Sequence, residues 1–419
     1  MADILEIWGG RPLCGTVQVP SAKNSVLPLL AATVLCQGKV CLRRVPDLSD
    51  VEAALDLLRA VGLSVRRCGD TVQMRPAEHP GAVLPTELMQ KMRASVLLLA
   101  PVLCRCGSVE ASLPGGCKLG ARPIDMHLDG LVQLGAELHW RQERLCLHAP
   151  RGLTGTTYTL RSPSVGATET MLLAGVCAKG TTRVRNAARE PEVQDLARFL
   201  NACGGRISGI GTAELEIQGV AALHGCSYTP VPDRIYAATI ACACAAAGGQ
   251  VRVQGIRTEL LEPVLRLLET AGCQIRWEAD GFVIRRSGVL HGVGRVETGV
   301  YPGLPTDAAP LLAAALLRAD GPSCLCDRIF PRRFACAEGF ARMGAKVQVE
   351  GAALHIAPGG LLHGSSVQAQ DLRGGAALAI AALAAAGKTE ISDSFYLKRG
   401  YSDIKADFRT LGAKALMKK

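Results

Sequence analysis

A short glycine-rich segment, residues 114–123, holds the most reactive combination of side chains in the chain. It reads Pro-Gly-Gly-Cys-Lys-Leu-Gly-Ala-Arg-Pro, so Cys117 lies beside Lys118 and five residues before Arg122. Glycine lets backbone approach a ligand closely, while neighbouring cations favour the thiolate and attract anions. The segment predicts a cysteine that offers a proton or a nucleophile to an anionic substrate. With 17 Cys in the chain, an inert core cysteine is the alternative, which the adjacent charges disfavour.

Other polar side chains lie where apolar helices are expected to begin. Lys23 and Asn24 follow Ser21, which is placed to act as an N-cap; a solvated lysine in a capping turn is the alternative. Helix N-termini present unpaired N–H groups and a positive dipole end, which suit anions. Similar starts carry Arg93, Ser162 to Thr168, Asp307 and Asp371-Leu372-Arg373. For Asp307, helix capping is a serious alternative because the dipole favours a carboxylate there.

Composition excludes several classes of function. The net charge is +10, but Lys and Arg are dispersed and no basic run interleaves with aromatics, so a site for a phosphorylated small molecule is favoured over nucleic acid. The chain has no P-loop, no G-x-G-x-x-G after a strand and no H-E-x-x-H motif. The pairs Cys104/Cys106, Cys242/Cys244 and Cys324/Cys326 have no nearby histidine. We therefore predict no bound metal and no cofactor.

Cysteine usage and apolar runs indicate the compartment. The 17 Cys are odd in number and scattered, and the chain starts without a basic stretch followed by an apolar one. The apolar runs 235–249 and 376–387 are Ala-rich and too short to span a bilayer. These features predict a cytoplasmic protein with reduced thiols and no membrane partner.

A sixfold repeat organises the chain. An amphipathic helix is closed by a glycine at intervals of 68 to 73 residues, at Gly62, Gly135, Gly204, Gly272, Gly344 and Gly412. The pattern around each glycine predicts a unit of strand, helix, strand, helix, strand, strand. The sixth unit ends one hairpin short, and the N-terminal strand Ile4 to Trp8 is expected to supply a strand there.

Six units divide most simply into two α/β domains of three units each. We expect one domain over residues 22–230, which carries the Cys117 segment. The second would combine residues 1–21 with residues 231–419 and be closed by the N-terminal strand. The charged helix starts are then expected to converge on one cleft.

On these residues, the chain resembles UDP-N-acetylglucosamine 1-carboxyvinyltransferases. These enolpyruvyl transferases catalyse the first step of bacterial peptidoglycan synthesis, on which cell shape and division depend. The resemblance covers essentially the whole chain. It implies two inside-out α/β domains of three units each, with a cleft between them. The most specific motifs are Ser21-Ala22-Lys23-Asn24, Met92-Arg93-Ala94-Ser95, Pro114 to Pro123, Ser164 to Thr168, Ala187 to Glu192, Pro232-Asp233-Arg234-Ile235, Pro305-Thr306-Asp307, Asp371-Leu372-Arg373 and Arg399-Gly400-Tyr401.

The resemblance also implies substrates and roles. The substrates would be phosphoenolpyruvate and the sugar 3-hydroxyl of UDP-N-acetylglucosamine. Cys117 would protonate the enolpyruvate methylene, could form an adduct with it, and would be the target of epoxides such as fosfomycin. Asp307 would act as base near the sugar hydroxyl. The ligands of phosphoenolpyruvate would be Lys23, Asn24, Arg122 and Arg399, with Arg333 and Arg373 as further cations nearby. Lys23 and Arg399 would also act in catalysis. UDP-sugar contacts would be Arg93, Arg122, Pro123, Ile124, Asp125, Met126, Ser162, Pro163, Ser164, Val165, Asp307 and Ile329.

Four departures from the family pattern leave alternatives open. Tyr236-Ala237-Ala238 stands where an acidic residue and a glycine are usual, Ala308-Ala309 where Met-Gln is usual, Pro331 where an acidic residue is frequent, and Ser162 where some members have Lys. None removes the proposed acid, base or phosphate ligands. One alternative is a divergent UDP-sugar-binding paralogue without catalysis. Another is a transferase acting on shikimate phosphate, which lacks this cysteine segment.

Overall fold

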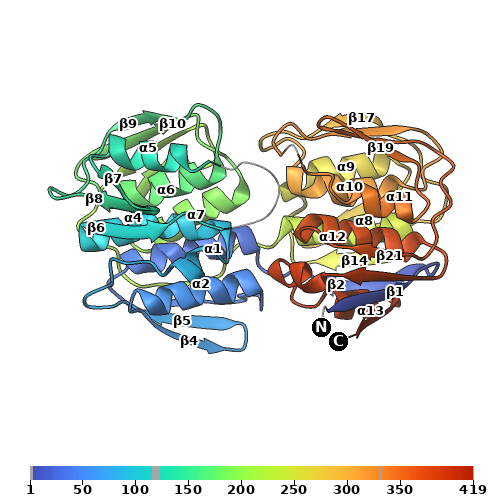
Figure 1. The fold of residues 1–419 in the computed structure, drawn as a ribbon, viewed down its shortest axis with the longest axis horizontal. Coiled ribbons are helices and arrows are strands. Elements are labelled where there is room, and N and C mark those ends of the chain that lie inside the picture. Colours follow the sequence, from blue (N-terminus) through green and yellow to red (C-terminus); the bar gives the residue numbers. More distant parts are fainter. Residues whose placement is uncertain (1–2, 116–122, 331, 419) are drawn as a thin grey trace. The chain divides into compact units, whose positions relative to one another are not determined.

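The computed structural model describes residues 3–115, 123–330 and 332–418. These residues divide into two compact units. Among the described residues, the first unit is formed from residues 21–115 and 123–231, and the second unit from residues 3–20, 232–330 and 332–418. Each unit is coloured and labelled along the chain in Figure 1.

In the first unit, helices alternate with short strands. The helices are α1 (Lys23–Ala32), α2 (Ser49–Ala60), α3 (Thr86–Met89), α4 (Leu99–Cys106), α5 (Asp125–Gln133), α6 (Val165–Gly175) and α7 (Pro191–Ala202), with 3-10 turns η1 (Thr33–Leu35) and η2 (Arg93–Leu98). The strands are β3 (Val40–Leu42), β4 (Ser64–Cys68), β5 (Thr71–Arg75), β6 (Ser108–Ser112), β7 (Glu137–Arg141), β8 (Arg144–His148), β9 (Thr157–Thr159), β10 (Thr181–Arg185), β11 (Arg206–Ser208), β12 (Glu214–Gln218) and β13 (Ser227–Tyr228). They form sheets in the orders β13-β3-β5-β4, β6-β8-β7 and β11-β12-β10-β9.

The second unit has the same alternation. Its helices are α8 (Arg234–Ala247), α9 (Glu262–Thr270), α10 (Ala309–Leu316), α11 (Ala337–Arg342), α12 (Leu372–Ala384) and α13 (Ile404–Thr410), with 3-10 turns η3 (Thr258–Leu260), η4 (Thr306–Ala308) and η5 (Ser394–Arg399). Its strands are β1 (Ile4–Trp8), β2 (Leu13–Gln18), β14 (Gly249–Gln254), β15 (Gln274–Glu278), β16 (Gly281–Arg286), β17 (Gly294–Glu297), β18 (Ser323–Cys326), β19 (Val347–Glu350), β20 (Ala353–Ile356), β21 (Ser366–Gln368), β22 (Lys388–Ser392) and β23 (Lys414–Lys418). The sheet orders are β15-β16-β14-β2, β17-β18-β20-β19 and β21-β22-β1-β23.

The repeat predicted from the helix-closing glycines is present in the structure. Gly62, Gly135, Gly204, Gly272, Gly344 and Gly412 all have φ between 89° and 100°, a region that residues with a Cβ rarely adopt. Each ends an amphipathic helix and leads toward a strand. The described residues accordingly form six small sheets. Several of these sheets contain both parallel and antiparallel strand pairs, so the fold is of the mixed α/β class.

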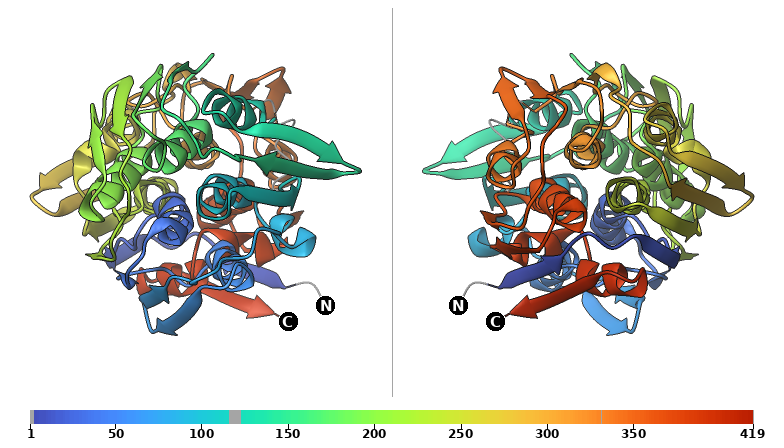
Figure 2. Two further views of the ribbon diagram at one scale, coloured as in Figure 1. Left: turned by 90° about the vertical axis from the view of Figure 1, so that its left-hand side faces the viewer. Right: turned by 90° about the vertical axis from the view of Figure 1, so that its right-hand side faces the viewer.

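The N-terminal strand completes the sixth sheet, as the sequence predicted. β1 pairs antiparallel with β22 on one side and with β23 on the other, with Ile7 opposite Thr389 and Ala415. Both views in Figure 2 show β1 beside β23, at the place where the two chain ends lie. The first and last strands therefore share one sheet, with β1 inside it and β23 at its edge.

Three Ala-rich helices fill the centre of the second unit. α8, α10 and α12 pack against one another (Figure 1), and every residue of α10 and α12 is buried. Small side chains let such helices approach closely, but they offer no polar groups for the helix ends. Asp233 and Asp371 satisfy the first N–H groups of α8 and α12. Two carboxylates of this unit thus lie at the N-termini of buried helices.

No helix in the described part of the chain is long and apolar enough to cross a membrane.

Candidate active site

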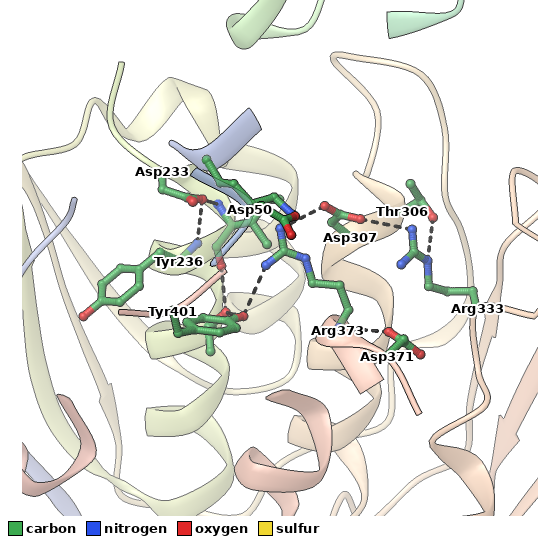
Figure 3. Close-up of polar contacts among 12 residues, drawn as sticks. Asp50, Asp233, Tyr236, Thr306, Asp307, Arg333, Asp371, Arg373 and Tyr401 are labelled. Atoms are coloured by element: carbon green, nitrogen blue, oxygen red, sulfur yellow. Dashed lines mark hydrogen bonds and ion pairs between the residues drawn. The ribbon is translucent and has the colours of Figure 1, made fainter. Parts of the chain in front are cut away.

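Asp307 is held between two buried arginines in the second unit. Its Oδ1 accepts a hydrogen bond of 3.0 Å from Arg333 Nη2, and its Oδ2 accepts one of 3.0 Å from Arg373 Nη2 (Figure 3). The arginine side chains are 2% and 5% exposed, whereas that of Asp307 is 25% exposed. A carboxylate so held has a fixed orientation and one accessible side.

Arg333 is anchored by the strand and turn around it. Its Nε donates to Thr306 Oγ1 at 3.0 Å and lies 3.5 Å from Asp327 Oδ2. Asp327 follows β18 and is fully buried, and its Oδ1 accepts from the N–H groups of Ile329 and Phe330 at 2.9 and 3.0 Å. The Arg333 guanidinium also lies 4.8 Å from the centre of the Phe330 ring. These contacts set the position of Arg333 before any ligand binds.

Arg373 is anchored by a second set of contacts, at the start of α12. Its Nη1 donates to Tyr401 OH at 3.4 Å, and its backbone N–H donates to the capping carboxylate of Asp371 at 2.9 Å. Burial acts to lower the pKa of Arg373, but the charge of Asp307, followed by those of Tyr401 and Asp233, outweighs it and raises the pKa. Arg373 therefore stays charged despite its burial.

The capping alternative for Asp307 is wrong. The residue lies in the turn η4 before α10, and neither η4 nor α10 has a side-chain cap; both Asp307 oxygens accept from arginines instead. Arg333 and Arg373, expected as cationic groups near a phosphate ester, are thus already paired with a carboxylate. An incoming anion would have to share or exchange these partners with Asp307.

Lys23 begins α1 in the first unit and pairs with a helix-start aspartate. Lys23 Nζ lies 3.2 Å from Asp50 Oδ2, and the two side chains are 13% and 6% exposed. Asn24 follows, half-buried. The expected capping role of Ser21 is wrong, because the N-cap position is Ala22 and Ser21 Oγ donates to the carbonyl of Pro230 at 3.2 Å.

A buried aspartate on α7 ties the start of α1 to a distant segment. Asp195 is 1% exposed and accepts from Ser25 Oγ, from Tyr228 OH at 2.7 Å and from the Val231 N–H at 3.0 Å. Burial raises the pKa of Asp195 against the effect of these donors. The contacts fix the first turn of α1, and with it the position of Lys23.

The residues at and just before the start of α5 contact one other predicted site residue, Arg93. Arg93 Nη2 donates to the Pro123 carbonyl at 3.0 Å, and Tyr158 OH donates to the Met126 carbonyl at 3.1 Å. Asp125 forms an ion pair with Arg161, and the hydrogen bond from this guanidinium lowers the pKa of Asp125. Next to Asp125, Ile124 is 7% exposed. The predicted residues Arg93 and Pro123 to Met126 thus share a local network.

The start of α6 carries the next group of predicted residues. Ser164 caps the helix, its Oγ accepting from the Ala167 N–H at 3.4 Å. Ser162 is exposed, and Pro163 and Val165 are half-buried. The His127 ring packs against Gly166 and forms a hydrogen bond of 2.7 Å with Thr170. A Cβ at position 166 would lie 2.8 Å from His127 Cε1, so only glycine leaves room for the ring.

The remaining predicted residues have less specific surroundings. Arg399 ends η5 and is half-buried, and Ile329 is 42% exposed. Cys117, Arg122 and Pro331 lie outside the described residues. Among the residues that are described, no group of three His, Cys, Asp or Glu could hold a metal ion.

Two departures from the family pattern are core positions. Tyr236 is 5% exposed and its hydroxyl hydrogen-bonds Asp407, while Ala308 is fully buried. Tyr236 also packs on Tyr401 with ring centres 6.3 Å apart. These substitutions change packing behind Asp307 and leave its two arginine contacts in place.

Sequence reasoning overlooked several supporting residues. Asp327, Asp50 and Asp195 hold Arg333, Lys23 and the start of α1, and Thr306 and Tyr401 hold the two arginines. Thr306 and Tyr401 stand inside motifs that were already recognised. The aspartates carry a weaker signal, a carboxylate at a helix start or directly after a strand, which has many other uses.

Comparison with known proteins places this site in a family. The family model of EPSP synthase (3-phosphoshikimate 1-carboxyvinyltransferase) matches residues 7–408. A UDP-N-acetylglucosamine 1-carboxyvinyltransferase of Gluconobacter oxydans is 42% identical over 411 residues, 98% of each chain. A Staphylococcus aureus protein with the name UDP-N-acetylglucosamine 1-carboxyvinyltransferase 1 is 39% identical over 414 residues, again 98% of each chain.

Solved structures agree with that relationship. The enolpyruvyl transferase NikO from Streptomyces tendae has a TM-score of 0.90 at 26% identity, covering 99% of both chains. An EPSP synthase from Acinetobacter baumannii has a TM-score of 0.77 at 19% identity over all of both chains, a likeness of fold alone. The chain belongs to the enolpyruvyl transferase family, in the group of UDP-N-acetylglucosamine 1-carboxyvinyltransferases.

Proposed function

We propose that the protein transfers the enolpyruvyl group of phosphoenolpyruvate to the 3-hydroxyl of UDP-N-acetylglucosamine, with release of phosphate, as the first committed step of peptidoglycan synthesis. The observation that carries the proposal is the 42% identity over 98% of the chain to a protein of that name. The geometry of Asp307 supports it, since a carboxylate oriented by two guanidinium groups suits the removal of a proton from an alcohol.

The reaction needs an acid and a base. A proton is added to the methylene carbon of phosphoenolpyruvate, and the sugar oxygen, as its own proton leaves, forms a bond to the neighbouring carbon. The resulting tetrahedral intermediate then loses phosphate as its C–O bond breaks, and the methyl group returns a proton to restore the double bond. An acid and a base each contribute about 10² to 10⁴-fold in rate.

The side chains divide these tasks. We infer that Cys117 delivers the proton to carbon and that Asp307 accepts the proton of the sugar hydroxyl. Lys23, Asn24, Arg122 and Arg399 bind phosphoenolpyruvate, with Arg333 and Arg373 as further cations. Fixed cations stabilise the charge of the departing phosphate without any reorganisation during the reaction. The UDP-sugar is assigned to Arg93, Arg122, Pro123, Ile124, Asp125, Met126, Ser162, Pro163, Ser164, Val165, Asp307 and Ile329.

The domain organisation enters the proposal as well. We infer that residues 22–230 and residues 1–21 with 231–419 act as two inside-out domains that close over the substrates, which would exclude water from the intermediate. UDP-N-acetylglucosamine should then compact the protein in solution scattering, and an unchanged profile would argue against closure. A cytoplasmic location remains a prediction from the thiol content.

The decisive experiment is phosphate release by the purified protein. We expect release with phosphoenolpyruvate and UDP-N-acetylglucosamine together, and none with either alone. Cys117→Ser should lose most turnover and all sensitivity to thiol-directed epoxides. Cys68→Ser, at an exposed cysteine of the first unit, is the matched control and should behave as wild type. Full activity of Cys117→Ser would remove Cys117 as the acid.

The main alternative is a UDP-sugar-binding paralogue without catalysis. It was suggested by the departures at Tyr236 and Ala308, which the structure places in the core. Binding of the UDP-sugar without any phosphate release would favour this alternative. Release with shikimate 3-phosphate in place of the UDP-sugar would instead favour the shikimate-type transferase.

A further inference from the structure

A chain of buried hydrogen bonds leads from α8 to the carboxylate of Asp307, and Figure 3 labels its members Tyr401, Arg373 and Asp307. Thr239 Oγ1 lies 2.8 Å from the Ile235 carbonyl and 2.7 Å from Tyr401 OH. Tyr401 OH lies 3.4 Å from Arg373 Nη1, and Arg373 Nη2 lies 3.0 Å from Asp307 Oδ2. Thr239, Tyr401 and Arg373 are 0%, 2% and 4% exposed. Water therefore has little access to the chain of contacts.

One order of donors and acceptors makes every contact in this chain a hydrogen bond at the same time. A carbonyl oxygen can only accept, so the single hydroxyl hydrogen of Thr239 is directed to Ile235. Thr239 can then only accept from Tyr401, which uses the single phenolic hydrogen. Tyr401 consequently presents a lone pair to Arg373, whose guanidinium can only donate. Each bond thus supports the next, from the helix backbone to Asp307.

This order matters because Arg373 has few other anchors. Within the described part of the chain, its side chain donates to Asp307 and to Tyr401. The Tyr401 ring also lies 6.0 Å from the guanidinium carbon. Arg333, by contrast, is held by Thr306 and by the charged Asp327. Loss of the Tyr401 hydroxyl would therefore remove one of the two hydrogen bonds that orient the Arg373 side chain.

We propose that Thr239 and Tyr401 are positioning residues that orient Arg373, and through it the carboxylate of Asp307, by a hydrogen-bond relay with a fixed proton order. The proposal rests on the proposed function, because the orientation of Asp307 affects the rate only if Asp307 takes part in the reaction. Neither residue touches the substrates; both act through Arg373.

Tyr401→Phe tests the relay, because it removes the hydroxyl and keeps the ring. We expect kcat to fall about 10-fold, with much smaller changes in the two KM values, since a displaced base slows the chemical step more than binding. The pH dependence of kcat should change as well. Tyr396→Phe removes a hydroxyl from the same turn, η5, outside the relay, and should leave kcat and its pH dependence unchanged.

Thr239 tests the proton order. Thr239→Val keeps the shape but leaves Tyr401 without its acceptor, so kcat should fall in the same direction as in Tyr401→Phe. Thr239→Ser restores a hydroxyl and should recover most of the lost rate. Equal losses in the valine and serine variants would show that only packing is involved and would overturn the relay, as would a wild-type kcat in folded Tyr401→Phe.

A thermodynamic cycle tests the relay independently of turnover. Hydrogen bonds link Thr239 to Asp307 through Tyr401 and Arg373. The effects of Thr239→Val and Asp307→Asn on the free energy of unfolding should therefore be non-additive beyond experimental error. Additivity would overturn the relay even if the wild type transferred no enolpyruvyl group. If the wild-type protein showed no transfer but the two substitutions were still non-additive in stability, the result would count against the proposed function and not against the relay.

Discussion

The ion pairs of Asp307 in the second unit and of Asp125 in the first unit differ in burial and in the number of contacts that hold them. In the second unit, Asp307 is fixed by Arg333 and Arg373, whose side chains are 2% and 5% exposed. In the first unit, Asp125 pairs with Arg161, and the two side chains are 41% and 66% exposed. Buried charges keep one geometry, whereas exposed charges remain free to exchange partners with a ligand.

The chemical identity of the cations extends this contrast. Lys23, a more buried cation of the first unit, forms an ion pair of 3.2 Å with Asp50. An ammonium group is a compact charge on a flexible stem, while a guanidinium group has five donors in a planar fork. The second unit thus suits the fixing of a reacting group, and the first unit suits the capture of a mobile anion.

The largest effect is expected at Asp307. Asp307→Asn keeps the shape of the side chain but removes its charge and basicity, so kcat should fall by about 10² to 10⁴-fold. UDP-sugar binding should remain measurable by calorimetry. In the first unit, Asp125→Asn should change kcat little and act mainly on the KM for the UDP-sugar. Near wild-type turnover of Asp307→Asn would contradict its assignment as base.

The next largest effect is expected on stability. Asp327→Ala leaves the Arg333 charge without its fully buried partner, which should lower the free energy of unfolding by about 3 to 5 kcal/mol. Asp125→Ala breaks an exposed ion pair and should lower it by less than about 1 kcal/mol. Urea denaturation measures both. Similar losses in the two variants would show that burial does not distinguish the units.

A third effect concerns pH. Burial, the largest cause, raises the pKa of Asp407 from 3.8 to about 6, although the hydrogen bond from Tyr236 acts to lower it. Between pH 4 and pH 6 the folded state therefore binds more protons than the unfolded state, and stability falls as pH rises through this window. Relative to wild type, Asp407→Asn should gain about 2 to 3 kcal/mol from pH 4 to pH 6.5.

Denaturation curves at several pH values measure this gain, with Asp280→Asn as the control at an exposed aspartate in the turn between β15 and β16 of the same unit. A constant difference between wild type and Asp407→Asn across the window would show that Asp407 has an ordinary pKa in the folded protein.

The smallest effect is expected at Arg161. Because the ion pair with Asp125 is exposed, Arg161→Ala should change stability only slightly, and the change should shrink further at high salt. If the Arg161 guanidinium also contacts the UDP-sugar, Arg161→Ala should raise the KM for that substrate by less than about 5-fold, and this increase should depend on salt. A loss of kcat comparable to that of Asp307→Asn would erase the proposed distinction between the units.

Much of the fold could be predicted because it depends on local patterns. The helix-closing glycines, spaced by 68 to 73 residues, marked six repeats, and all six have the positive φ that favours glycine. The missing hairpin of the last repeat predicted the place of β1, since an unpaired edge requires a strand. The capping role of Ser21 was wrong because its hydroxyl bonds a carbonyl 209 positions away.

The sequence predicted which residues form the candidate site better than it predicted the contacts between them. Lys23, Arg93, Ser164 and Arg373 lie at the helix starts where the sequence placed them. The aspartates that hold the site were not predicted, because they come from elsewhere in the chain. Asp50 pairs with Lys23, Asp195 accepts from Ser25 in the same helix as Lys23, and Asp327 pairs with Arg333. An aspartate before or after a regular element has several common uses, and the local sequence does not choose among them.

By itself, the sequence determined the repeat, the class of fold and the presence of both a cysteine and a carboxylate suited to proton transfer, because spacing and residue type are local properties. Only the tertiary structure decided what holds the carboxylate. Arg333 and Arg373 stand 26 and 66 positions from Asp307, yet each donates to one of its oxygens at 3.0 Å. Ion pairing depends on distance and burial in space, and these arise only when α10 and α12 pack.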